Sequence, residues 1–494
     1  MKKNNKIKFK LPYLRKGSYI LFLLMVIFIV YIRNFRLDND SWFLLNHGKY
    51  VFNNGIPYIE PFTIHENLTF VMQQWLSSLI FYICYDIFGI KSLLFLVISC
   101  NFLIVFLSYK LCMLISDNNY KISVIVTVIM DILLGAFYVV SRPQIFTFIL
   151  ILLLFYCLEL YIKTNKIKFL FLLPIISLLQ INLHASMWWM LYTFMLPYLL
   201  DGYKFKYFQH DVYKKRPILI AMIFMFIFAF INPYGLDAIT YLFKSYGVDV
   251  INDIVREMQP VNVNLFFGKL VYFSILAIFC INILVGKKEI KIRYFLLFVG
   301  TSYLALSSNK GFSYFLLASL FPVAFYLRDK IVLKKEQYSF VYKVNFLLGF
   351  IGILFIFLCT YFFVGVDYEN SLDEGIDLLL EKFDRNSINL YVGCNQGGYT
   401  EFRGIKSYLD PRAEVFLKAN NEKFDIFEEY YQLLYRNIKL NDFIKKYNFS
   451  HLLITESEII YDETNEISNY SLFYEGEISK GEDYRIYARN DLLS

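Results

Sequence analysis

Residues 144–162 read QIFTFILILLLFYCLELYI, an apolar run interrupted by a single charge, Glu159. About twenty such residues form a helix long enough to cross the hydrocarbon core of a bilayer. Similar runs recur along the 494-residue chain, which is 57% hydrophobic, 20% aromatic and only 18% charged, whereas roughly a quarter of the residues of a soluble globular protein are charged. The sequence therefore predicts an α-helical polytopic membrane protein, and it excludes disordered, collagen-like and disulfide-scaffold proteins.

The formal charge of +7 is unevenly distributed. Residues 365–494 hold 14 Lys and Arg against 25 Asp and Glu, a net of −11, which leaves 35 basic and 17 acidic residues, or +18, for residues 1–364. Apolar segments and basic loops make up the first part, and the second has the mixed helix and strand patterning of soluble sequence. We therefore expect a transmembrane domain over 1–366 and a small soluble α/β domain over 367–494.

Charge counting also predicts a topology, because short basic loops stay in the cytoplasm. The arrangement that places every strongly basic loop on one side has about eleven spans, at residues 17–34, 90–112, 122–140, 144–162, 168–184, 187–201, 217–232, 269–286, 292–308, 311–328 and 343–364. Counting 75–89 as another span would invert everything downstream, so we expect an interfacial or re-entrant helix there. The N-terminus is then cytoplasmic, and the first outer loop (35–89) and the C-terminal domain are extracytoplasmic.

Two carboxylates, Asp38 and Asp40, follow the first predicted span. Chance alone gives roughly one Asp-x-Asp pattern in a chain of this composition, so the position of the motif matters more than its spacing. It lies at the membrane boundary, at the C-terminal end of an apolar helix, where the helix dipole and desolvation disfavour carboxylates. The alternative is a solvated loop that merely carries charge.

Other polar residues are predicted on the same outer side. They are Arg142 in SRPQ, His184 in INLHAS, Asn232 in INPYG, Arg256 and Glu257 in VREMQP, and Asn309 and Lys310 in SSNKG. Arg and Lys at this depth suit a lipid phosphate. Each residue also has a simpler explanation: the cations snorkel to headgroups, the histidine is a satisfied buried imidazole, and Asn232 ends a helix.

Two charges fall inside predicted spans. Asp131 lies in the middle of one span, where it is either functional or a polar contact between helices. Glu159 lies near a cytoplasmic end and is expected to snorkel. In the tail we expect a turn at Gly397–Tyr399, a helical stretch over 420–447, and an ion pair between Asp410 and Arg412.

The stretch DNDSWFLLNHGKYVFNNGIPYIEPFTIHENLTFVMQQWLSSLIFYICYDIFG (38–89) resembles the first outer loop of bacterial membrane glycosyltransferases of the GT-C superfamily. The resemblance continues through SRPQIFTF, INLHAS, INPYGLDAI, VREMQP and SSNKGFSYF to NQGGYTEFRGIKSYLDPRAEVF in the tail. It covers most of the chain and is most similar to a bacterial branch with a C-terminal extracytoplasmic domain, of the protein mannosyltransferase and aminoarabinose transferase type. It implies juxtamembrane helices at 42–54 and 74–88.

The resemblance also implies a reaction, inverting sugar transfer from a polyprenyl-phosphate-linked donor to a glycan, lipid or protein acceptor. Asp38 and Asp40 match the catalytic acidic motif, and Gln73-Gln74-Trp75-Leu76 departs from a His-Glu pair that relatives carry, so Glu257 is hypothesised to supply the missing acid. We expect Asp40 or Asp38 to act as the base. The expected substrate-binding residues are Arg142, His184, Lys310, Arg256, Gln74 and Trp75.

Mg²⁺ or Mn²⁺ bound by Asp38, Asp40 and Glu257 is compatible with the hard oxygen ligands, although the superfamily motif also works without metal. Membrane lipids are implied partners, and the basic residues mark cytoplasmic loops, so they make no case for nucleic acid. Two alternatives remain open: a flippase or transporter of lipid-linked saccharides, which would favour midplane charges or repeats, and a non-catalytic scaffold of cell-envelope assembly. The tail either binds acceptor or caps the fold.

Overall fold

The computed structural model describes residues 37, 39–201, 208–209, 211–245, 247–285, 290–330, 371–479 and 481–493. These residues form two compact units, each described by itself below. The helical unit comprises residues 93–235 and 255–330, and the mixed unit comprises residues 37–92, 236–254 and 371–493. The predicted spans 17–34 and 343–364, the predicted domain boundary at 366 and Asp38 lie outside the described residues.

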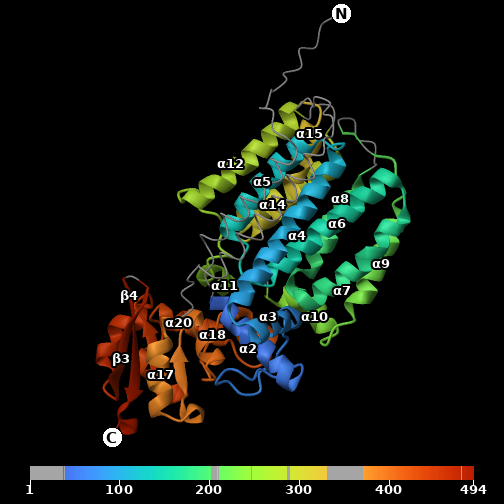
Figure 1. The fold of residues 1–494 in the computed structure, drawn as a ribbon. Coiled ribbons are helices and arrows are strands. Elements are labelled where there is room, and N and C mark those ends of the chain that lie inside the picture. The colour runs from blue at the N-terminus through green and yellow to red at the C-terminus, as the bar shows by residue number, and fades with distance from the viewer. Residues whose placement is uncertain are drawn as a thin grey trace, which may run out of the picture. The chain divides into compact units, whose positions relative to one another are not determined.

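A helix occupies each predicted span that falls within the described residues (Figure 1). These helices are α4 (Lys91–Ile115), α5 (Tyr120–Phe137), α6 (Gln144–Thr164), η1 (Ile167–Leu172) with α7 (Leu173–Leu183), α8 (Trp188–Leu200), α9 (Arg216–Ala229), α12 (Phe266–Cys280) with the π turn η3 (Ile281–Val285), α13 (Ile292–Ser307), and α14 (Gly311–Ser319) with α15 (Phe321–Leu327). The short η2 (Ala185–Met187) joins α7 to α8.

The sequence sets several of these helix boundaries. The Asn119 side chain accepts a hydrogen bond from the Ile122 amide and so caps α5. Prolines lie in the first turn of α7, α9 and α15, where their fixed φ suits the helix and no amide is lost. After α9 the Asn232 side chain donates to the Ala229 carbonyl at 2.6 Å and accepts from the Tyr234 amide at 2.8 Å, so Asn232-Pro233 lies in the turn that follows the end of this helix.

Four helices are long and apolar enough to cross a bilayer: Lys91–Ile115, Tyr120–Phe137, Gln144–Thr164 and Phe266–Val285. The Phe266–Val285 helix is the least covered by other elements, and Phe273 and Leu276 on it are exposed. Exposed apolar side chains of this size belong against lipid tails, so these four helices indicate a membrane protein. The other apolar helices are shorter than 18 residues, and the count of about eleven spans remains a prediction.

The mixed unit contains helices and a four-stranded sheet. Its helices are α2 (Asn39–Asn54), α3 (Trp75–Phe88), α10 (Leu236–Ser245), α11 (Asp249–Ile254), α17 (Asp373–Lys382), α18 (Cys394–Phe402), α19 (Lys418–Asn421), α20 (Ile426–Leu434) and α21 (Leu440–Tyr447), with short turns η5 (Arg385–Ser387), η6 (Ala413–Phe416), η7 (Ile459–Glu466) and η8 (Asn490–Leu492). Its strands are β1 (Leu390–Val392), β2 (His451–Thr455), β3 (Tyr470–Ser479) and β4 (Glu482–Arg489), in the order β1-β2-β4-β3. β1 is parallel to β2, and the other neighbours are antiparallel. The predicted α/β character of the tail is confirmed.

Residues of the predicted first outer loop pack against the tail within this unit. The Ile64 amide donates to the Ser407 carbonyl at 3.0 Å, and His65 Nε2 lies 2.9 Å from the Tyr408 carbonyl. Helices α2 and α3 cross closely at Gly48, where a Cβ atom would lie 2.1 Å from the Ser78 carbonyl oxygen. Only glycine allows this approach.

Two local expectations need correction. Residues 397–399 are not a turn but lie inside α18, where a Cβ at Gly397 would lie 1.7 Å from the Leu409 carbonyl oxygen. The stretch 420–447 is helical as expected and contains α20 and α21, separated by residues 435–439. Glu159 does not snorkel: it is buried and ion-paired with Arg293.

Candidate functional site

Three loops meet at one end of the helical unit, and they carry four of the predicted site residues. The Arg142 Nη1 donates to Glu257 Oε1, so the loop after α5 contacts the loop before α12. The Lys310 amide, in the turn between α13 and α14, donates to the Glu257 carbonyl at 3.0 Å. Arg142, Arg256, Glu257 and Lys310 are thus brought together, and we call them the loop cluster.

Asn309 holds the loop cluster in place. Its amide donates to the Gln259 carbonyl at 3.0 Å, and its side chain donates to the Arg256 carbonyl at 2.8 Å. The Tyr138 hydroxyl, at the end of α5, donates to the Asn309 carbonyl at 2.5 Å. These bonds link all three loops, so the loop cluster has a defined backbone frame.

The turn that carries Lys310 depends on the glycine after it. A Cβ at Gly311 would lie 1.9 Å from the Leu304 carbonyl oxygen, so the backbone folds against the end of α13 in a way that other residues cannot. Gly311, the glycine of SSNKG, therefore allows the turn that positions Lys310.

The loop cluster remains open to ligands. The side chain of Arg142 is 20% exposed, that of Glu257 is 44% exposed, and Arg256 is exposed. An ion pair at this level of exposure is screened by solvent and contributes about 0–1 kcal/mol. A phosphate, which accepts charge-assisted hydrogen bonds from Arg and Lys, can therefore compete for these cations.

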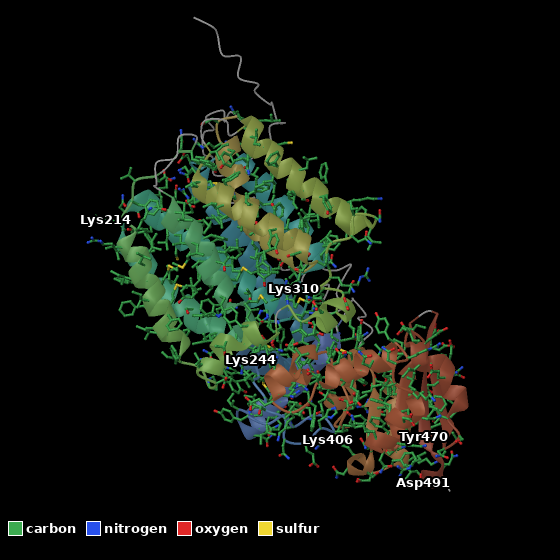
Figure 2. The ribbon with its side chains drawn as sticks, turned by 180° about the vertical axis from the view of Figure 1, so that it is seen from behind. Lys214, Lys244, Lys310, Lys406, Tyr470 and Asp491 are labelled. Atoms are coloured by element: carbon green, nitrogen blue, oxygen red, sulfur yellow. The ribbon has the colours of Figure 1, made fainter. Side chains whose placement is uncertain are left out.

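Basic residues gather at the opposite end of the same helices. Figure 2 labels Lys214, before α9, and Lys310, before α14, and they lie at opposite ends of the helical unit. Lys291, just before α13, contacts Asp211 at 2.5 Å, and the Gln209 amide donates to the Ile290 carbonyl at 2.9 Å. The described parts of the predicted cytoplasmic loops therefore share the end away from the loop cluster.

His184 lies in the bundle between α7 and η2. It is buried, its Nδ1 lies 2.9 Å from Thr147 Oγ1, and its carbonyl accepts from Gln180 Nε2 at 2.9 Å. Lys310 is near enough to interact with it electrostatically. These contacts match the simpler explanation, a hydrogen-bonded buried imidazole, on the side of the loop cluster.

The remaining predicted residues belong to the mixed unit. Asp40 lies in the first turn of α2, where the helix dipole favours a carboxylate. Gln74 is buried directly before α3, and Trp75 is the first residue of α3. Helices α2 and α3 confirm the expected helices at 42–54 and 74–88.

The described residues contain no group of three or more His, Cys, Asp or Glu arranged to hold a metal ion. Asp40 and Glu257 belong to different units, and Asp38 is not described. The described residues therefore give no ligand set for the Mg²⁺ or Mn²⁺ considered above, and no reaction step is assigned to a metal.

The sequence reasoning missed a buried charge cluster in the mixed unit. Arg412 Nε donates to Asp410 at 2.8 Å, which confirms the expected ion pair, and Arg412 Nη2 donates to Glu60 Oε1 at 2.8 Å. Glu401 Oε2 lies 3.7 Å from the same nitrogen. We call Glu60, Glu401, Asp410 and Arg412 the buried cluster.

Burial and the crowding of acids set the protonation of this cluster. Burial and the nearby Asp410 raise the pKa of Glu401 well above its ordinary range, although Arg412 opposes them. Burial alone would lower the pKa of Arg412, but Asp410, Glu60 and Glu401 raise it well above its ordinary value. The cluster is therefore a guanidinium held by carboxylates from two distant parts of the sequence.

A second missed network lies at the basic end of the helical unit. Arg293, which is 2% exposed, donates from Nε and Nη2 to Glu159 at 3.1 Å each, and from Nη1 to Asp201 and Asp211 at 2.5 and 2.6 Å. Asp131, left open above, accepts from Asn101 Nδ2 at 2.9 Å and so makes a polar contact between α5 and α4. No single local pattern in the sequence points to these partners.

In comparisons with known protein families and with curated protein sequences, the chain matches no family model and no curated protein.

Proposed function

We propose that this chain is an integral-membrane glycosyltransferase of the GT-C type. It transfers a sugar from a polyprenyl-phosphate-linked donor to a glycan, lipid or protein acceptor at the cell envelope, on the extracytoplasmic face. The proposal includes about eleven spans in the bacterial cell membrane, a cytoplasmic N-terminus and an extracytoplasmic C-terminal domain.

The observation that carries the proposal is the loop cluster. Arg142, Glu257 and Lys310 come from three loops far apart in the sequence, yet they share one end of the helical unit, away from the basic loops. If short basic loops are cytoplasmic, the loop cluster faces the other side of the membrane. Two cations and an acid at this end of the helical unit suit a lipid-linked phosphate.

The proposed reaction assigns a role to each residue. The acceptor hydroxyl oxygen attacks the anomeric carbon, its proton passes to Asp40 or Asp38, and the bond from the anomeric carbon to the phosphate oxygen breaks with inversion. Arg142 and Lys310 hold the leaving phosphate, which displaces Glu257 from Arg142, and Glu257 then orients the donor. General-base help of this kind is worth roughly 10²–10⁴-fold, and the rest comes from positioning and from stabilising the leaving anion.

The other predicted residues have supporting roles in this proposal. Arg256, exposed beside Glu257, adds positive charge near the phosphate. His184, which is buried with its Nδ1 2.9 Å from Thr147 Oγ1, is kept in this proposal as a substrate-binding residue. Gln74 and Trp75, at the start of α3, contact the acceptor or the donor sugar.

The test is transfer by the purified full-length chain in nanodiscs, with lipid-linked sugars extracted from the parent cells as donors and release of the polyprenyl phosphate as the readout. Asp38→Asn and Asp40→Asn should each be compared with Asp462→Asn, which alters an exposed acid outside the predicted site. We expect a loss of about 10²-fold or more in at least one of the first two variants. If Asp38→Asn and Asp40→Asn both transfer sugar at the wild-type rate, the proposal is wrong.

A second measurement separates transfer from lipid-linked saccharide transport. If the chain is a flippase, labelled donor changes leaflet in proteoliposomes without its sugar–phosphate bond breaking. If it is a transferase, the bond breaks and the label moves to the acceptor. Surface glycan and glycoprotein composition of a deletion strain would then identify the acceptor.

A further inference from the structure

A cavity of about 280 Å³ opens in the mixed unit between α2 and the residues that end α18. One wall is formed by α2 and the loop after it, and the other by residues 401–406. Both walls belong to the same compact unit. The volume lies just below the usual range of small-ligand sites and fits one sugar ring.

One side chain that lines the cavity has unused hydrogen-bonding capacity. Asn46 is 8% exposed, and its buried Nδ2 has no hydrogen-bond partner within the described residues. A buried amide of this kind normally finds a partner. Because the Asn46 side chain lines the cavity, a rotation that turns its Nδ2 toward the cavity would let it donate to an oxygen of a bound molecule.

Two lysines face the cavity from its opposite walls. Lys49 is on α2, and Lys406, labelled in Figure 2, is on the segment after α18. Both are exposed, and no described acid forms an ion pair with either. Glu401, which also lines the cavity, is buried and lies 3.7 Å from Arg412 Nη2, so its ion-pair partner is Arg412 and not a lysine of the cavity.

Aromatic and amide groups complete the lining. Tyr50 and Phe62 meet edge to face at a centroid distance of 5.4 Å, and Phe402 lies on the other wall. Aromatic rings pack well against the C–H face of a sugar, and side-chain amides such as those of Asn53 and Asn54 both donate to and accept from hydroxyl groups.

We propose that this cavity binds a hexose-sized saccharide unit that carries one carboxylate or phosphate. Lys49 and Lys406 bind the anionic group, Asn46 Nδ2 donates to the ring oxygen or to a hydroxyl oxygen, and Tyr50 and Phe62 pack against the ring. The proposal goes beyond the transfer reaction, because it concerns a separate binding site and needs no turnover.

The test uses the full-length chain in nanodiscs of zwitterionic lipid and saturation-transfer NMR with four probes: glucuronate, glucose 6-phosphate, glucose and inorganic phosphate. We expect the two anionic sugars to bind at least about tenfold more tightly than glucose or phosphate, since one charge-assisted hydrogen bond is worth about that factor. Adding 1 M NaCl should weaken their binding.

Lys49→Gln and Lys406→Gln should each weaken glucuronate binding by about tenfold. Lys423→Gln, an exposed lysine of the same unit that does not line the cavity, is the matched control and should leave binding unchanged. All three positions are exposed, so the variants should fold like the parent.

Three results would overturn the proposal: no anionic sugar binds at concentrations up to about 10 mM, where even a weak site is detected; phosphate alone binds as tightly as glucose 6-phosphate, which indicates an anion site without sugar recognition; or Lys406→Gln and Lys423→Gln behave alike. Failure of the transfer assay would leave this binding test unaffected, so the two proposals fail separately.

Discussion

Replacing Arg412 with methionine tests whether the buried cluster holds the mixed unit together. Methionine keeps an unbranched apolar stem but removes the guanidinium, and Asp410, Glu60 and Glu401 then lose the cation that they share. Arg412 is 3% exposed, and the side chains of its three acidic partners are fully buried. The acids cannot reach water without opening the unit.

The expected cost follows from this burial. Removing one partner of a buried ion pair costs about 3–5 kcal/mol, because the remaining charge stays uncompensated. The guanidinium also lies 5.4 and 5.2 Å from the ring centres of Phe62 and Phe70, contacts worth about 0.5–2 kcal/mol. Protonation of Glu401 relieves part of the penalty, so we expect a loss of about 3–5 kcal/mol rather than the full sum.

Hydrogen–deuterium exchange on the full-length chain in nanodiscs measures this loss locally. The Phe62 and Thr63 amides donate to Glu60 Oε2 at 3.0 and 2.9 Å, so they report on the buried cluster directly. A loss of 3–5 kcal/mol should speed their exchange by about a hundred- to a few-thousand-fold.

The matched control is Arg485→Met, which removes a partly exposed partner of Glu475. Such pairs contribute about 0–1 kcal/mol, so exchange in the mixed unit should rise less than about fivefold. The reasoning is refuted if Arg412→Met and Arg485→Met change the exchange of Phe62 and Thr63 by the same factor.

Three further changes test packing, charge and helix content. Gly48→Ala should destabilise the mixed unit by at least about 1–3 kcal/mol, since its Cβ would overlap the Ser78 carbonyl, and a denaturant midpoint equal to the wild type would contradict the close crossing of α2 and α3. Gly300→Ala, the matched change in α13 with nothing within 4 Å of the new Cβ, should instead stabilise by about 0.5–1 kcal/mol in the same measurement. Burial raises the pKa of Glu458 from 4.5 to about 7, so the folded state keeps a proton that the unfolded chain loses, and stability falls as pH rises from 4.5 to 7 by on the order of 3 kcal/mol. Because glutamine does not titrate, the stability of Glu458→Gln relative to the wild type should be higher at pH 7.5 than at pH 5. A variant-minus-wild-type difference that is the same at both pH values would contradict this assignment.

The apolar runs predicted where helices form, because a bilayer-crossing helix needs only length and apolarity. Helices α4 to α9 and α12 to α15 lie at the predicted segments for that reason. The gathering of basic loops at one end follows from the alternation of consecutive helices, which charge counting captures. The apolar helices shorter than 18 residues are too short to be identified as membrane-crossing by length, so their crossing of the membrane stays a prediction.

Contacts between distant residues could not be predicted in the same way. Glu159 looked like an isolated charge near a helix end because its partner Arg293 is 134 residues away, and Glu60 and Arg412 are 352 residues apart. Glycine at 397 suggested a turn because it has a low helix propensity, but tertiary packing against the Leu409 carbonyl overrides that preference. A single sequence carries local preference, whereas these features depend on which segments meet.

The two ends of the helical unit differ in how firmly their charges are held, and the difference bears on the proposed reaction. At the basic end, Arg293 is 2% exposed and has three acidic partners, so breaking that network costs several kcal/mol. At the other end, the Arg142–Glu257 pair is 20% and 44% exposed and contributes about 0–1 kcal/mol. A ligand phosphate can displace Glu257 from Arg142 at that small cost, whereas no ligand could displace the partners of Arg293. The Arg142–Glu257 pair, which can exchange partners, therefore lies where a lipid-linked donor would bind in the proposed reaction. The Arg293 network, which cannot, holds the helices together at the other end.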